Sequence, residues 1–102
     1  MSCKEALMRL GLPEDPVGQQ LEICVKLSRE VPELCLKAVI TRKEISGGFM
    51  ELTVDGRAGN VKINRLIRPI DQGLDEIMKG WLVCLVRNGS HETARMARVK
   101  TA

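Results

Sequence analysis

A cysteine and the single histidine form the one pair in this chain that suggests catalysis. Cys84 lies in the apolar run 82–86, and His91 follows Asn88-Gly89, a strong signal for a two-residue hairpin turn. A type I′ turn centred on Asn88 and Gly89 makes Cys84 and His91 diagonal neighbours, about 7–8 Å apart at Cβ. A cysteine nucleophile needs a base within hydrogen-bond reach and a group that orients the base. The pair has neither, so we predict that Cys84 is a core residue and that the chain is not an enzyme.

The other potential ligands form no metal or cofactor motif. No two cysteines make a C-x-x-C pair, and one histidine excludes a Cys₂His₂ set, so we predict neither a metal nor a cofactor. Asp71, Asp75 and Glu76 flank a predicted helical turn, whose N-terminal end favours carboxylates. We interpret the cysteines as reduced, at least half-buried thiols of a cytoplasmic protein, because the N-terminus does not resemble a signal peptide. These cysteines are Cys3, Cys24, Cys35 and Cys84.

Basic residues are the only feature that predicts a ligand. The net charge is +3, but four basic and six acidic residues in 1–34 are followed by twelve basic and seven acidic ones. A basic segment of this kind can bind phosphates. Phe49 and Trp81 are the only aromatic residues, so base stacking is scarce and binding would be weakly specific and salt-sensitive. The candidate nucleic-acid-binding residues are Lys62, Arg65, Arg68, Arg87, Arg95 and Arg98.

Local signals predict two helices in residues 1–31. Ser2 and Glu5 form a capping box for the first helix, which ends at Gly11. The second begins at Pro16 and ends near residue 30, ahead of Pro32. Its apolar face, which could pack against a second copy of the chain, consists of Val17, Leu21, Cys24 and Val25.

Alternating apolar residues predict strands from residue 34 onward. In the third strand the apolar residues switch from odd to even positions after Ile63, which indicates a bulge near Asn64-Arg65. In chain order we predict a strand over 34–41 with an extension to 45, a turn at 46–48, a strand over 49–54, a turn at 55–56, a strand from 61, a helical turn around 74–78 and a hairpin over 81–99.

These elements predict a single α+β domain spanning 1–102, in which the helical segment 1–31 packs on the β segment 34–100. The β segment is either a five-stranded antiparallel sheet or a small OB-like barrel with the helical turn between its third and fourth strands. We predict a non-enzymatic binding or assembly module that acts through protein–protein contacts, such as a phage-type or virion component, and has no membrane partner. The alternative is weakly specific binding of the nucleic-acid backbone by the basic residues.

Overall fold

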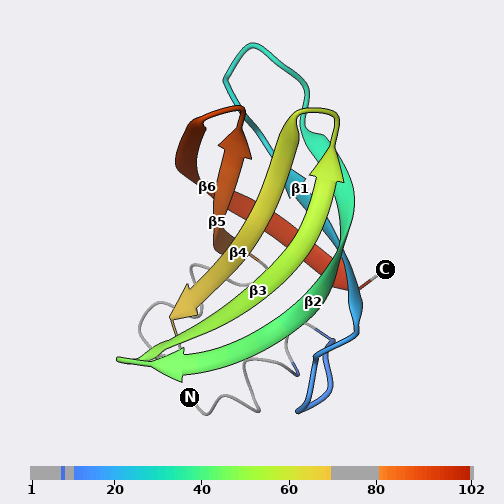
Figure 1. Ribbon diagram of the computed structural model, residues 1–102, viewed down its shortest axis with the longest axis vertical. Helices are drawn as coiled ribbons and strands as arrows, with labels where there is room; N and C mark the ends of the chain where they lie inside the picture. The colour runs from blue at the N-terminus through green and yellow to red at the C-terminus, as the bar shows by residue number, and fades with distance from the viewer. Residues whose placement is uncertain (1–7, 9–10, 70–80, 102) are drawn as a thin grey trace.

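Six antiparallel strands follow one another around a closed barrel in the computed structural model, which describes Met8, residues 11–69 and residues 81–101 (Figure 1). Each strand pairs with the next one in the chain, and the last pairs with the first. This is an up-and-down barrel, in which closure leaves no sheet edge unpaired. The strands are β1 Gln20–Val25, β2 Leu34–Ser46, β3 Phe49–Ala58, β4 Val61–Pro69, β5 Trp81–Asn88 and β6 His91–Thr101.

The predicted fold class is therefore wrong in its helical part and in its strand count. The second predicted helix is replaced by β1, a strand that closes the sheet between β2 and β6. The six-stranded meander also differs from the predicted five-stranded sheet or OB-like barrel. The first predicted helix lies outside the described residues except for Met8, which is helical, and the predicted helical turn at 74–78 lies wholly outside them.

The error at β1 arises because its apolar residues fit two periods. Leu21, Cys24 and Val25 have helical spacing, whereas Leu21, Ile23 and Val25 alternate as in a strand. In the barrel Leu21, Ile23 and Val25 all point inward, with at most 1% of each side chain exposed. Pairing with β2 and β6 satisfies the backbone of β1 on both sides while all three of these side chains are buried in the barrel.

The core is aliphatic and lines the inside of the barrel. The strand predicted over 34–41 with an extension to 45 is confirmed as β2, and the bulge predicted near Asn64-Arg65 is confirmed as a register shift between Ile63 and Arg65. The strand residues of this core are Leu21, Ile23, Val25, Leu36, Ala38, Ile40, Met50, Leu52, Val54, Val61, Ile63, Leu66, Cys84, Val86, Ala97 and Val99.

Two of the predicted turns lie elsewhere in the structure. Gly56 is inside β3, and the turn that follows is Gly59-Asn60. A Cβ atom on Gly56 would lie 2.7 Å from Ala38 Cβ, so only glycine lets β2 and β3 approach here. In the last hairpin Asn88 pairs with His91, which makes Gly89, with φ of 63°, the first central residue of the turn.

The register of the last hairpin therefore differs by two residues from the predicted one. No non-glycine residue in the described segments has a positive φ, so the type I′ turn predicted for Asn88-Gly89 is wrong and a II′ geometry takes its place. A shift of two residues preserves side-chain parity. Cys84 and Val86 therefore still share a face with Arg95 and Thr93, as predicted.

The two ends of the barrel are built differently (Figure 1). The connections β1–β2, β3–β4 and β5–β6 lie together at one end, whereas the β2–β3 turn lies at the other. We call this second end the plugged end because residues 11–19 pack there: Leu12 is 3% exposed, and Lys43 Nζ donates a hydrogen bond to the Glu14 carbonyl oxygen at 2.9 Å. Gly18 N–H donates a hydrogen bond to the Ile40 carbonyl oxygen, which joins this segment to β2.

A disulfide joins the first two strands. Cys24 and Cys35 lie directly opposite each other in β1 and β2, with 4.1 Å between their Cα atoms, and they are covalently linked. The prediction of reduced thiols is wrong for this pair, while Cys84 is a free, buried thiol. A disulfide that closes a loop as short as the one between Cys24 and Cys35 stabilises the folded protein by about 3 kcal/mol. The disulfide also weakens the reason for predicting a cytoplasmic location, since stable disulfides are rare there.

Candidate functional site

Three basic residues lie side by side across three neighbouring strands. Arg57 of β3 is directly opposite Lys62 of β4, and Lys62 is directly opposite Arg87 of β5. Their inward-facing neighbours Ile63 and Val86 are in the core, which places all three cations on the outer face. Strands are about 4.8 Å apart, so this cationic row spans roughly 10 Å of surface.

The cationic row is electrostatically unfavourable in the protein alone, because like charges directly opposite each other in a sheet destabilise it. Within the described segments, one carboxylate forms an ion pair with the row: Glu92, opposite Arg87, lies 3.6 Å from its guanidinium. Among the described residues no carboxylate forms an ion pair with Arg57 or Lys62. A ligand with several negative charges would relieve the repulsion.

A second group of cations surrounds a hollow at the same end of the barrel. The hollow is formed by the β1–β2 connection and by Arg95 of β6. Arg95 is directly opposite Cys84 and lies on the same face of the sheet, which is the face that points into the barrel. It lies beyond the end of β1, however. Its guanidinium donates a hydrogen bond to the Leu27 carbonyl oxygen at 3.4 Å, which holds the side chain over the hollow. The lining residues are Lys26, Leu27, Ser28, Arg29 and Arg95.

We call these two groups together the basic end. Two of its six cations lie in the β1–β2 connection and four lie in β3 to β6, near the β3–β4 and β5–β6 connections, and these three connections meet at one end of the barrel (Figure 1). Side chains at strand ends and connections are the least constrained by packing, so they can adjust to an irregular ligand. The residues of the basic end are Lys26, Arg29, Arg57, Lys62, Arg87 and Arg95.

The structure separates the six residues that the sequence suggested for nucleic-acid binding. Lys62, Arg87 and Arg95 belong to the basic end. Arg65 lies further along β4 and forms an ion pair with Glu51 at 3.0 Å. Arg98, on the outer face of β6, pairs with Glu33.

Arg68 is the most unexpected of the six. Only 1% of it is exposed, and it lies opposite Met50 towards the plugged end, inside the barrel. Its guanidinium interacts within the protein and has no surface to offer to a ligand. Arg68 is therefore not part of the surface that a nucleic acid could contact.

The residues predicted to pack against a second copy do not form a common surface. Leu21 and Val25 are in the core, and Cys24 is in the disulfide. Only Val17 is exposed, at 48%, in the segment before β1. These positions depended on the helix that β1 replaces.

Cys84 and His91 are also further apart than the predicted register placed them. Cys84 is opposite Arg95, whereas His91 is opposite Asn88 at the turn. Burial without a charged partner raises the pKa of the Cys84 thiol to about 12. The thiol is therefore protonated near neutral pH, and it lacks the thiolate character that a nucleophile needs.

Sequence reasoning missed Lys26, Arg29 and Arg57. The first two were assigned to a helix, and Arg57 followed a turn predicted at Asp55-Gly56 rather than at Gly59-Asn60. The Gly59-Asn60 pair could have revealed Arg57, because a two-residue turn there makes Arg57 and Lys62 directly opposite partners.

Fold and site together define a small six-stranded up-and-down barrel with one basic end. Comparison with protein-family models, curated proteins and solved structures finds no significant match for this chain. Among the described residues there is no helix with the length and apolarity needed to cross a membrane.

Proposed function

We propose that this protein binds the sugar–phosphate backbone of nucleic acid at the basic end. The observation that carries the proposal is the cationic row: Arg57, Lys62 and Arg87 are directly opposite one another on adjacent strands. A sheet gains no stability from such a row, whereas consecutive phosphates of a nucleic-acid strand would neutralise it.

The hollow extends this surface to a second anchoring point. Lys26, Arg29 and Arg95 add three cations at the same end, and Ser28 adds a hydroxyl that can donate to a phosphate oxygen. Arginine is suited to this use because its planar guanidinium can contact two phosphate oxygens at once.

The composition of the basic end argues for contact with phosphates rather than bases. Phe49, the aromatic residue whose side chain is described, lies at the β2–β3 turn, at the opposite end of the barrel. Stacking on aromatic side chains supplies much of the affinity of single-strand-binding barrels. Binding without it is electrostatic, weakly sequence-specific and strongly dependent on salt.

The test is the salt dependence of oligonucleotide binding, measured by fluorescence anisotropy with a labelled single strand. Replacing Arg57, Lys62 and Arg87 together by glutamine removes three phosphate contacts, so the slope of log affinity against log salt should fall by about 2. The matched control replaces Arg42, Lys43 and Arg65 by glutamine, which changes the net charge equally but should leave the slope unchanged.

Two results would contradict the proposal. One is the absence of binding by the unmutated protein at low salt. The other is an equal loss in both triple variants, which would show that net charge matters and the cationic row does not. Circular dichroism of each variant checks that the β-sheet is intact.

Assembly through protein contacts is a second proposal, supported by a different surface. At the plugged end Ile45 and Phe49 are each about half exposed, and Phe49 borders a shallow hollow with Glu44, Glu51 and Ile67. Exposed apolar side chains beside charged ones are typical of protein interfaces. Light scattering tests this proposal, and a solution mass of one chain at all concentrations would contradict self-association.

A further inference from the structure

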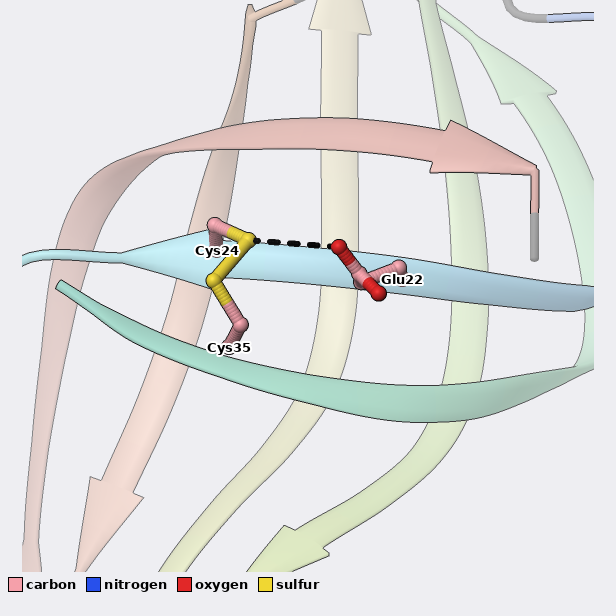
Figure 2. A group of neighbouring side chains, drawn as sticks. All are labelled: Glu22, Cys24 and Cys35. Atoms are coloured by element: carbon pink, nitrogen blue, oxygen red, sulfur yellow. Dashed lines mark hydrogen bonds between the residues drawn. A yellow bond between two sulfur atoms is a disulfide. The ribbon is translucent and has the colours of Figure 1, made fainter.

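The disulfide and a neighbouring glutamate point to a second site, on the side of the barrel. Glu22 and Cys24 are two residues apart in β1 and face outward, and Cys35 is directly opposite Cys24 in β2 (Figure 2). The Glu22 carboxylate oxygen is 3.8 Å from Cys24 Sγ. The two sulfur atoms and a Glu22 oxygen all lie within 4.8 Å of one another.

We propose that the reduced form of this cluster binds a zinc ion through Cys24, Cys35 and Glu22. Two thiolates and a carboxylate suit a borderline-soft ion, whereas Mg²⁺ and Ca²⁺ take oxygen ligands alone. Zinc bonds of about 2.3 Å to sulfur and 2.0–2.2 Å to oxygen place the ligand atoms of one ion roughly 3.5–4 Å apart. Cys35 is exposed, so water can take the fourth position.

The site depends on the redox state of the cysteine pair. A dithiol gives two electrons and two protons to the disulfide, the S–S bond breaks, and the dithiol leaves as its own disulfide. The zinc ion then displaces a proton from each of the two thiols, which bind as thiolates. In the oxidised form both sulfurs are consumed by the S–S bond, and only Glu22 remains as a ligand.

The barrel holds the cluster together without the disulfide. β1 pairs with β2 over Gln20–Val25 and with β6 over Leu21–Val25, so reduction leaves both ladders intact. On the inner face, Ile23 and Leu36 are also directly opposite each other and buried. The two sulfurs therefore stay on adjacent strands, and rotation about their Cα–Cβ bonds can bring them to the separation that zinc requires.

Neighbouring charges on the same face limit which groups can take part. Lys100, opposite Glu22 on β6, forms an ion pair with it, with 3.2 Å between Nζ and the carboxylate. This ion pair must break before Glu22 can bind the zinc ion. Lys100 is exposed and Glu22 is half-buried, so water screens this pair and its loss costs little. Glu33 lies 3.8 Å from Cys35 Sγ, but Arg98 holds its carboxylate in an ion pair.

Cobalt(II) is the probe that distinguishes thiolate ligation from adventitious binding. The full chain carrying Cys3→Ser is reduced with dithiothreitol, freed of reductant without oxygen and titrated with Co²⁺, and Zn²⁺ is then added. We expect a thiolate-to-cobalt charge-transfer band that saturates at one ion per chain and disappears as Zn²⁺ displaces Co²⁺. The oxidised chain should show no such band.

Variants assign the ligands. Cys35→Ser should abolish the charge-transfer band of the pair. Glu22→Gln should weaken Zn²⁺ binding by more than about tenfold, the smallest effect usual even for an outer-sphere partner of a metal ligand. Glu44→Gln removes another exposed, ion-paired glutamate of the same sheet and should leave the affinity unchanged.

Several outcomes would overturn the proposal. These are the absence of a charge-transfer band in the reduced chain, an unchanged band in Cys35→Ser, or equal Zn²⁺ affinity in Glu22→Gln and the parent. Loss of the β-sheet circular dichroism signal on reduction would overturn it as well, because the strands must hold the two sulfurs together.

Discussion

Both ends of the barrel carry basic residues, but they use them differently. At the plugged end Arg42 pairs with Glu44, Lys43 donates to the Glu14 carbonyl oxygen, and Arg68 is buried in the core. At the basic end, no carboxylate among the described residues forms an ion pair with Lys26, Arg29, Arg57 or Lys62. The three cations named at the plugged end thus interact within the protein, whereas these four cations of the basic end are available to a ligand.

The difference follows from what covers each end. Residues 11–19 supply carbonyl groups and the buried Leu12 to the plugged end, so charged side chains there find partners within the chain. At the basic end, the described residues contribute the three connections between strands, and Arg95 donates a hydrogen bond to the Leu27 carbonyl oxygen at the hollow. Net charge alone does not reveal such a division, because it counts paired and unpaired cations alike.

The largest expected effect tests the tight packing below the basic end. Gly56→Ala places a Cβ 2.7 Å from Ala38 Cβ and from Leu36 Cδ1 and 3.2 Å from a backbone oxygen, so we expect a loss of about 2–3 kcal/mol in the free energy of unfolding. At the plugged end Gly48→Ala meets no atom within 4 Å, and its φ of 79° alone should cost about 1 kcal/mol. Urea denaturation measures both, and equal losses would show that the interior near Gly56 can expand.

A smaller effect tests whether the hollow at the basic end is sealed from the core. Cys84 lies opposite Arg95, and burial raises its pKa from 9.0 to about 12. The unfolded chain then releases its proton first, so the contribution of Cys84 to stability is complete below pH 9 and is lost as the pH rises towards 12.

The measurement compares the parent with Cys84→Ala between pH 8 and pH 10.5. Across this range the parent should lose about 1–2 kcal/mol more stability than the variant, since each pH unit between the two pKa values contributes at most about 1.4 kcal/mol. Cys84 should also react slowly with thiol reagents in the native state. Rapid labelling, or parallel pH profiles, would mean that water reaches the thiol through the hollow.

The smallest effect sharpens the contrast in ligand binding. Glu92→Gln removes the carboxylate that is ion-paired with Arg87 of the cationic row, so oligonucleotide affinity at low salt should rise by about two- to fivefold, as expected for an exposed pair. Glu44→Gln at the plugged end changes the net charge equally and should have a weaker effect. If both variants gain the same affinity, the ligand does not distinguish the two ends.

Much of the β segment could be predicted from the sequence because its signals are local. The strand that alternation predicts from residue 34, the turn at the glycine pair 47–48 and the bulge after Ile63 each depend on a few neighbouring residues, and the structure confirms all three. The division of the last hairpin into two faces was also predicted correctly, because an error of two residues in register leaves each side chain on its face.

The candidate sites, by contrast, were decided by the tertiary structure. The sequence determined an aliphatic core, a strand-rich chain and an excess of positive charge after residue 34. It did not determine β1, because the apolar residues in 20–25 fit both a helical and a strand period. Pairing with β2 and β6 in the folded barrel selects the strand. Closure of the barrel around β1 brings Cys24 opposite Cys35, gathers Lys26 and Arg29 with Arg95, and leaves Arg68 inside. Such contacts depend on pairing between distant strands, and a local pattern carries no information about them.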